Sequence, residues 1–192
     1  MLPGLADPTL DSQRIFRSVL EAVSNPGRIV DVPAAIQAPA PLHPATAAVC
    51  LTLLDYDTPV WLDAAAARPE VIEWLKFHCS VPLADERASA RFALVADAPT
   101  MPPLAAFDAG TAEHPEHSAT IIVQVQALLG GTGRTLTGPG IASEVHLDIA
   151  GVPAAFWGWT SDNHALFPRG VDMFVSAGRV ITALPRTTRV GD

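Results

Sequence analysis

The chain has 192 residues, of which 49% are hydrophobic, and its 12 basic and 20 acidic side chains give a net charge of −8. This length and composition favour a single folded domain, residues 1–192, over a disordered chain. The negative charge argues against nucleic acid or an anionic membrane as a partner, because both bind positively charged surfaces. No apolar run reaches the roughly 18–20 residues of a membrane helix, and the first residues lack a signal-peptide pattern, so we expect a cytoplasmic protein.

Helical and strand patterns alternate along the first half of the chain. Apolar residues at helical spacing predict a helix over Ser12–Asn25, capped by Asp11 or Ser12. Its predicted buried stripe consists of Ile15, Phe16, Val19, Leu20 and Val23. The other elements predicted here are a short strand at Ile29–Val32, an extended connector at Pro33–Pro44, a helix at Pro44–Leu54, a strand at Thr58–Leu62, a helix at Pro69–Cys79 and a strand at Arg91–Ala96.

Strands dominate the predictions for the second half. Alternating residues predict a strand over Ala119–Leu129, a turn at Gly130–Gly133 and a returning strand at Arg134–Thr137. The remaining predictions are a strand at Val145–Ile149, a helix at Val152–Ala165 and a hairpin of Val171–Ala177 and Arg179–Leu184 around Gly178. These elements together indicate an α/β fold with a mixed sheet flanked by helices.

The glycine-rich stretch LLGGTGRTLTGPGIASEV, residues 128–145, twice approaches a nucleotide-binding pattern. A Walker loop is disfavoured because its leading glycine is replaced by Leu128 and its lysine is missing. A dinucleotide fingerprint at Gly138–Ser143 is disfavoured because strand spacing follows it, where a helix is required. The glycines are therefore interpreted as turn residues, with Gly138–Gly140 redirecting the chain.

Cysteine and histidine residues give weak signals for chemistry. With two cysteines, Cys50 and Cys79, the chain cannot supply a four-cysteine zinc or iron–sulfur site, and we expect both thiols to be buried. His78 lies on the predicted apolar stripe of its helix and is interpreted as a core histidine. In the segment Glu113–His117, the two histidines are three residues apart around a proline, which favours a solvated loop over a metal site. We therefore predict no bound metal.

Two arginine motifs are better candidates for ligand binding. Arg169 and Arg186 each follow a proline at a strand end, and Arg186 is followed by Thr187 and Thr188. A guanidinium, two hydroxyls and backbone donors are therefore available for a phosphate or carboxylate. The alternative is an arginine paired with a local acid such as Asp172. Asp57 belongs to an acidic pair with Asp55 at a helix-to-strand junction, where aspartates more often stabilise turns than act in catalysis.

Motifs spread over about 170 residues resemble one known family. They are Phe16-Arg17 with Ser24, Pro26 and Gly27; LTLLDYDTPVWL at Leu51–Leu62; Phe77-His78; GTAEHPEHSAT at Gly110–Thr120; LTGPGI at Leu136–Ile141; FPRGVD at Phe167–Asp172; and PRTT at Pro185–Thr188. In this order and spacing they are similar to PhnH, the H-subunit family of the bacterial carbon–phosphorus lyase core complex.

The resemblance implies a subunit of a transferase complex. It implies G, I and J subunits as partners, a homodimer when isolated, and a fold like that of pyridoxal-phosphate-dependent transferases without the cofactor. The residues agree, because the single lysine, Lys76, is predicted to face solvent near Glu73, so we expect no internal aldimine and no cofactor. The resemblance assigns no catalytic residue. Arg17, Asp57, Arg169, Asp172, Arg186 and Thr187 are candidate ligand-binding residues.

Three functions are compatible with these observations. The first is an assembly subunit that supports formation of alpha-D-ribose 1-methylphosphonate 5-triphosphate from ATP and methylphosphonate, as the family resemblance implies. The second is a ligand-binding subunit that holds phosphate or phosphonate through Arg169 or Arg186. The third is an independent enzyme that uses Asp55 and Asp57. Whether the chain is itself catalytic is left open by the sequence.

Overall fold

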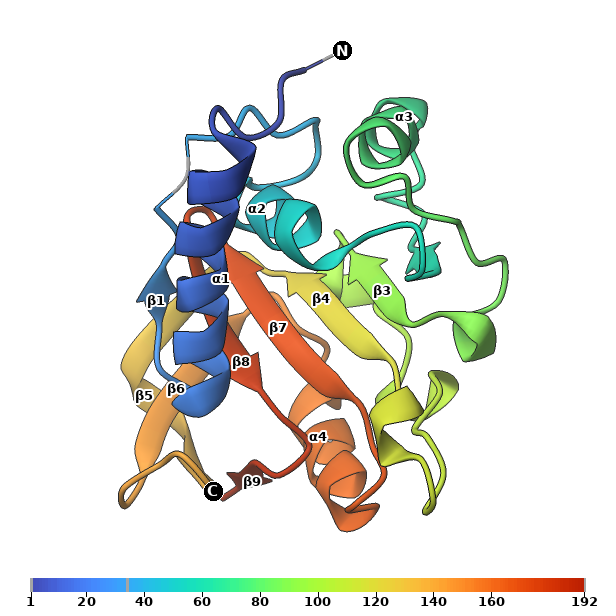
Figure 1. Ribbon diagram of the computed structural model, residues 1–192. Coiled ribbons are helices and arrows are strands. Elements are labelled where there is room, and N and C mark those ends of the chain that lie inside the picture. Colours follow the sequence, from blue (N-terminus) through green and yellow to red (C-terminus); the bar gives the residue numbers. More distant parts are fainter. Residues whose placement is uncertain (1, 34, 192) are drawn as a thin grey trace.

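The computed structural model describes residues 2–33 and 35–191 (Figure 1). Residues 1 and 192, the ends of the predicted domain, and residue 34, within the predicted connector Pro33–Pro44, lie outside the described residues. The helices are α1 (Pro8–Ser24), α2 (Pro44–Leu53), α3 (Pro69–Cys79) and α4 (Phe156–Ala165). The strands are β1 (Val30–Asp31), β2 (Val60–Leu62), β3 (Phe92–Val95), β4 (Thr120–Gln124), β5 (Ala127–Thr137), β6 (Val145–Ala150), β7 (Asp172–Ala177), β8 (Val180–Leu184) and β9 (Arg189–Val190).

A six-stranded mixed sheet forms the centre of the molecule, in the order β1-β8-β7-β4-β3-β2. Strands β2, β3, β4 and β7 are parallel, and β8 runs antiparallel to them. Strand β1 pairs antiparallel with β8 and therefore runs in the same direction as the four parallel strands. A smaller antiparallel sheet has the order β6-β5-β9. The predicted α/β class with a mixed sheet flanked by helices is confirmed.

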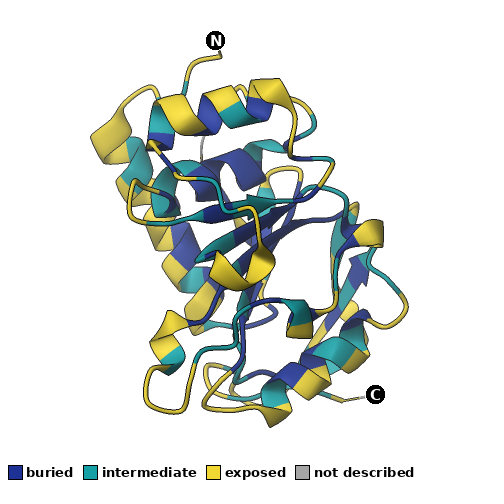
Figure 2. Cartoon of the chain, turned by 90° about the vertical axis from the view of Figure 1, so that its right-hand side faces the viewer, coloured by how far each residue is buried: buried dark blue, intermediate teal, exposed yellow. Residues whose placement is uncertain are grey.

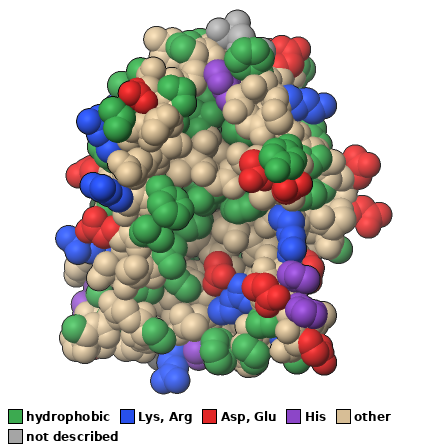
Figure 3. All heavy atoms as spheres, viewed as in Figure 1, with side chains coloured by type: hydrophobic (Ala, Val, Ile, Leu, Met, Phe, Trp, Pro, Cys, Tyr) green, Lys and Arg blue, Asp and Glu red, His purple; other side chains and the backbone are tan. Residues whose placement is uncertain are grey.

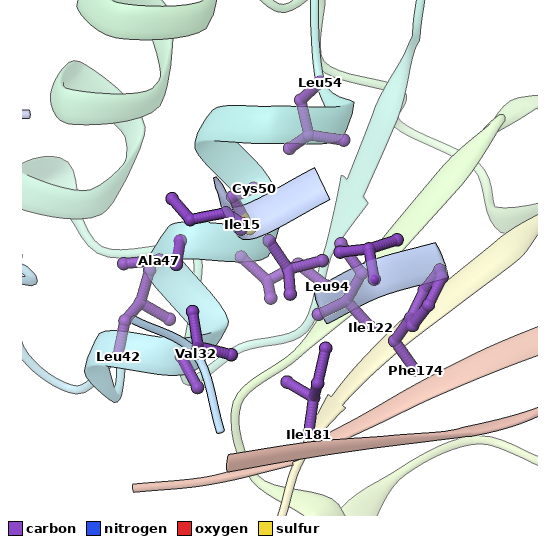
Figure 4. Close-up of a cluster of buried hydrophobic side chains, with 14 of the residues drawn as sticks. Ile15, Val32, Leu42, Ala47, Cys50, Leu54, Leu94, Ile122, Phe174 and Ile181 are labelled. Carbon is purple, nitrogen blue, oxygen red and sulfur yellow. The ribbon is translucent and has the colours of Figure 1, made fainter. Parts of the chain in front are cut away.

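Both faces of the central sheet are covered, which explains its nearly continuous apolar sequence. On one face, Leu94, Ile122 and Phe174 pack beneath α1, α2 and α3 (Figure 4). On the other face, Ile121 and Met173 belong to a second apolar cluster shared with α4 and the small sheet. The central strands are accordingly buried between exposed outer surfaces (Figure 2). Within the described residues, none of the helices combines the length and apolar character needed to cross a bilayer.

Helix α1 begins earlier than predicted and buries a different face. The helix starts at Pro8, and the Asp7 carboxylate caps it by accepting hydrogen bonds from the backbone N–H groups of residues 9 and 10. The prediction of Asp11 or Ser12 as the cap is therefore wrong. The core takes Ile15, Val19 and Ala22 from this helix, while three other residues of the predicted buried stripe are exposed: Phe16, Leu20 and Val23.

The predicted strand Ala119–Leu129 is in fact two strands in different sheets. After β4, the N–H of Val125 donates to β7 and the N–H of Gln126 donates to the last residue of β6, so the chain passes from one sheet to the other. The predicted turn at Gly130–Gly133 is also wrong. These glycines lie inside β5, where Gly130 and Arg134 both oppose Leu147 and the residues between them form a bulge.

Some of the other local predictions agree with the structure, whereas Arg134–Thr137 continues β5 instead of forming a returning strand, and the helix predicted from Val152 begins at Phe156. Helix α3 has the predicted bounds, and β7 and β8 form the predicted antiparallel hairpin around Gly178. The chain turns at Gly138–Gly140, between β5 and β6, as expected. His78 is only half-buried, because it lies at the edge of the α3 stripe, with its ring against Trp74 and Phe77.

Candidate functional site

Most of the sequence motifs meet at one edge of the central sheet, which we call the amino edge because β2, β3, β4 and β7 begin there. These four strands start in register, through Val60, Phe92, Thr120 and Asp172. Strand β8 runs the opposite way and therefore ends at the same edge. Four motifs far apart in sequence lie at this edge as a result: LTLLDYDTPVWL, GTAEHPEHSAT, FPRGVD and PRTT.

Arg186 holds the amino edge together. Its Nε and Nη2 donate to the two carboxylate oxygens of Asp172 at 3.2 and 2.6 Å, and its backbone N–H also donates to that carboxylate. Nη2 donates to the Ser118 hydroxyl at 2.5 Å, and Nη1 donates to the carbonyl oxygens of Pro115 and Pro168 at 2.8 and 3.3 Å. The side chain is only 13% exposed. All five N–H donors of the guanidinium therefore have protein acceptors.

This geometry matches the alternative weighed from the sequence, an arginine paired with Asp172. A phosphate or carboxylate that binds the Arg186 guanidinium would have to displace some of these protein acceptors. The acceptors belong to the loop before β4, to the loop before β7 and to β7 itself. Ligand binding by Arg186 and Asp172 stays a prediction, and their observed contacts fasten the ends of β7 and β8 to the preceding loops.

The other candidate residues are partly dispersed. Arg169 is exposed and follows Pro168, whose carbonyl oxygen accepts a hydrogen bond from Arg186. Thr187, the residue after Arg186, is half-buried. Asp57 is exposed before β2, at the same edge of the sheet, and its backbone N–H donates to the Asp55 carboxylate in a turn. Arg17 is exposed on α1. The structure thus brings Asp172 and Arg186 into contact, with Arg169 and Thr187 adjacent to this group along the chain. Arg17 on α1 and Asp57 before β2 lie outside this group.

A small apolar cavity adjoins the amino edge. Its volume is about 250 Å³. It is lined by Val23, Thr120, Asp172, Met173, Phe174, Ala183 and Pro185. Val23 also belongs to the exposed residues of α1, so the cavity continues into an uncovered apolar stripe on that helix. We define this α1 stripe as Phe16, Leu20 and Val23, whose side chains are 44%, 48% and 40% exposed.

The opposite edge of the sheet carries a buried polar network that the sequence interpretation missed. Gln124, at the end of β4, accepts hydrogen bonds from the His43 backbone N–H at 2.6 Å and from the Thr46 hydroxyl at 2.9 Å. The Thr46 hydroxyl also contacts Ser176 at 2.8 Å. His43 Nδ1 accepts from the N–H of Gly178, and burial lowers the pKa of His43, so its neutral ring carries its proton on Nε2.

This network fastens the start of α2 to the carboxyl ends of β4 and β7. A 240 Å³ cavity lies beside it, with His43, Asp97, Gln124 and Gln126 among its lining residues. The available sequence signal was a glutamine inside the otherwise apolar run Ile121–Val125, since a buried polar side chain requires partners.

Both cysteines are buried, as predicted. Desolvation raises the pKa of Cys79 to about 12 and raises that of Cys50 as well. At pH 8 the thiolate fraction of Cys79 is then about a thousandfold lower than in an unfolded chain. We predict that an aromatic disulfide reagent labels neither thiol of the native chain at pH 8 but labels both in denaturant. Labelling of a native thiol at the denatured rate would contradict this burial.

Lys76 lies on the exposed face of α3, as predicted. A lysine on an outer helix face is poorly placed for a buried Schiff base. The absence of a cofactor stays a prediction.

The chain matches the family described as bacterial phosphonate metabolism protein (PhnH) over residues 3–191. It is 38% identical, over 187 residues, to the alpha-D-ribose 1-methylphosphonate 5-triphosphate synthase subunit PhnH of Rhizobium meliloti (strain 1021). The matched region covers 97% of this chain and 94% of the relative. It is also 38% identical over 81 residues, 42% of each chain, to the putative C-P lyase subunit protein HtxG of Stutzerimonas stutzeri. From the length of these matches, the chain belongs to the PhnH family of bacterial phosphonate metabolism proteins.

Proposed function

We propose that this chain is the H subunit of a cytoplasmic carbon–phosphorus lyase core complex. In this role it supports formation of alpha-D-ribose 1-methylphosphonate 5-triphosphate from ATP and methylphosphonate, as an assembly subunit. The names of its relatives, a synthase subunit and a C-P lyase subunit, support this proposal. We further propose the G, I and J subunits as its partners, a homodimer when it is isolated, and a scaffold related to the pyridoxal-phosphate-dependent transferases without the cofactor.

The observation that carries the assembly role is the α1 stripe. Phe16, Leu20 and Val23 lie at positions i, i+4 and i+7 of the helix and point to one side of it. Figure 3 shows hydrophobic side chains gathered on the face that carries α1 and β7. Large apolar side chains that adjoin one another on a surface mark protein contacts more often than isolated ones do. The neighbouring cavity offers a recess for a side chain of the partner.

A double substitution in the α1 stripe tests this role. Phe16→Glu with Leu20→Glu places two carboxylates in the proposed contact, and we expect capture of this chain by the tagged G, I and J subunits to weaken by at least about 30-fold. The melting temperature of the isolated chain is expected to change little, because both side chains are already exposed.

The matched control is Leu129→Glu. Leu129 lies in β5 and is 50% exposed, so it is as accessible as the stripe residues but lies on another element. Capture of this variant should equal that of the parent chain. Equal capture of the stripe variant and the control would contradict the assignment of the contact to α1.

The alternative is a subunit that binds phosphate or phosphonate through Arg169 or Arg186. One observation favours Arg169 over Arg186, since Arg169 is exposed whereas the donors of Arg186 are occupied. Calorimetric titration of the purified chain with ATP and with methylphosphonate separates the two roles. Binding that Arg169→Ala abolishes would support the ligand-binding role, and the absence of heat at millimolar ligand supports the assembly role.

A further inference from the structure

A short turn before β4 brings two imidazoles and a carboxylate together on the surface of the amino edge. Residues Pro115–His117 form a single 3₁₀ turn. His114 Nδ1 lies 3.2 Å from Glu116 Oε1, and His117 Nε2 lies 3.8 Å from the same oxygen. The two imidazole rings are stacked, with centroids 4.9 Å apart and planes inclined by 14°. One ligand atom from each of the three residues lies within 4.8 Å of the other two.

We propose that His114, Glu116 and His117 form a binding site for a divalent transition-metal ion of the zinc type. Bonds of about 2.0–2.1 Å in a tetrahedral zinc site place the ligand atoms roughly 3.3–3.5 Å apart. The two measured distances from Glu116 Oε1 lie within about half an ångström of this value. The three side chains are exposed, so they are free to rotate toward a common ion from positions in which their ligand atoms already lie within 4.8 Å of one another.

The composition of the site favours zinc over magnesium or calcium. Imidazole nitrogen suits zinc, copper and nickel, whereas magnesium and calcium prefer oxygen ligands alone. Two histidines and one glutamate are also the three-ligand set of metal sites that keep a fourth position open. The site therefore has room for a water molecule or another oxygen donor on the solvent side.

The backbone of the turn is held in place by groups that do not belong to the proposed ligand set. Arg91 donates a hydrogen bond to the carbonyl oxygen of His117, and Arg186 donates to that of Pro115 at 2.8 Å. The Thr111 hydroxyl accepts from the N–H of His114 at 3.0 Å. Fixed backbone positions reduce the conformational entropy that ligand binding must overcome, so Arg91 and Arg186 act as positioning residues.

Local electrostatics leave the carboxylate available. The Glu116 side chain is exposed, and its Oε1 faces the imidazoles of both His114 and His117. The charge of Arg186 is already balanced by Asp172. Without a metal, an exposed histidine–glutamate contact contributes little stability, so the fold does not depend on these three side chains.

The test uses the full chain, titrated with Co²⁺ and followed by visible absorption, and with Zn²⁺ followed by calorimetry. We expect one ion per chain, a Kd below about 100 μM, and the intense absorption of tetrahedral Co²⁺. Glu116→Gln and His117→Gln should each weaken binding by about 100-fold or more, because even the loss of an outer-shell partner costs 10–100-fold.

The matched control is His146→Gln. His146 is an exposed histidine whose Nε2 lies 3.5 Å from the Glu144 carboxylate, and so it offers the same kind of pair without a third ligand. This variant should bind Co²⁺ like the parent chain. The proposal is overturned if Kd for both ions exceeds 1 mM, an order of magnitude beyond the expected limit. It is also overturned if His146→Gln lowers affinity as much as His117→Gln does. Unchanged melting temperatures of the three variants show that their effects are not due to unfolding.

Discussion

Arg186→Ala is expected to destabilise the chain by about 3–5 kcal/mol, one of the largest effects of any single substitution at the amino edge. The substitution removes a guanidinium that is 13% exposed and whose five N–H groups all donate to protein acceptors. Asp172 loses its counter-charge and keeps one hydrogen bond, from the backbone N–H of residue 186. For a chain of this size the melting temperature should fall by about 10 °C in calorimetry.

Two comparisons make this result interpretable. Arg169→Ala removes an exposed arginine from the same edge and should change stability by less than about 0.5 kcal/mol. Arg186→Lys keeps the charge but loses the planar fork, so its melting temperature should lie between those of the parent and Arg186→Ala. If Arg186→Ala melts like Arg169→Ala, the structural role assigned to Arg186 is wrong.

Gly140→Ala is the second substitution with a large expected effect, about 3 kcal/mol or more. Gly140 has a φ of +84°, where an L side chain is strained, and a Cβ there would lie 2.2 Å from the carbonyl oxygen of Ser24 and 2.9 Å from Pro26. Neither neighbour can rotate away, because one is backbone at the end of α1 and the other is a proline ring. Equilibrium unfolding in urea measures the loss as a lower midpoint.

Gly131→Ala is the control for the backbone contribution. Gly131 has a φ of +79°, but no heavy atom lies within 4 Å of the added Cβ. This variant should lose only about 1–2 kcal/mol, from the left-handed conformation alone. Equal losses for the two variants would mean that the close approach of the 138–140 turn to the end of α1 has no energetic importance.

The helices and strands were predictable where a proline or a glycine fixes the end of the element. Pro44 and Pro69 occupy the first helical positions of α2 and α3, and both helices begin there. Proline is favoured at this position because the N–H group that it lacks has no partner within the helix. Gly178 closes the β7–β8 hairpin for a comparable reason, since glycine adopts the left-handed conformation of the loop. In both cases the information lies within a few residues of the element.

Predictions failed where the outcome depends on tertiary contacts. The alternation across Ala119–Leu129 is the same whether the chain stays in one sheet or crosses to another, and only the partners of Val125 and Gln126 decide it. Helix α1 shows the same limit. Its largest apolar side chain, Phe16, is exposed while Ala22 is buried, because the face that packs is set by β8 and α2 rather than by side-chain size.

The candidate site was predictable residue by residue but not as an arrangement. The sequence identified Arg186 and Asp172 as a possible pair, and the structure confirms that contact. Their meeting with the Gly110–Thr120 segment follows from the parallel register of β4 and β7, which no local pattern encodes. The predicted solvated character of the Glu113–His117 segment agrees with the exposed side chains of His114, Glu116 and His117, but the 3₁₀ turn that brings them together is not encoded by any local helical spacing.

The central claim is that this chain contributes surfaces for assembly, through the α1 stripe, more than chemistry of its own. The most direct measurement is the composition and activity of the core complex purified through another subunit, from cells with and without this chain. The account predicts that without it the G, I and J proteins fail to assemble fully and that synthesis of the ribose phosphonate triphosphate is lost. A complete and fully active complex that lacks this chain would contradict the account.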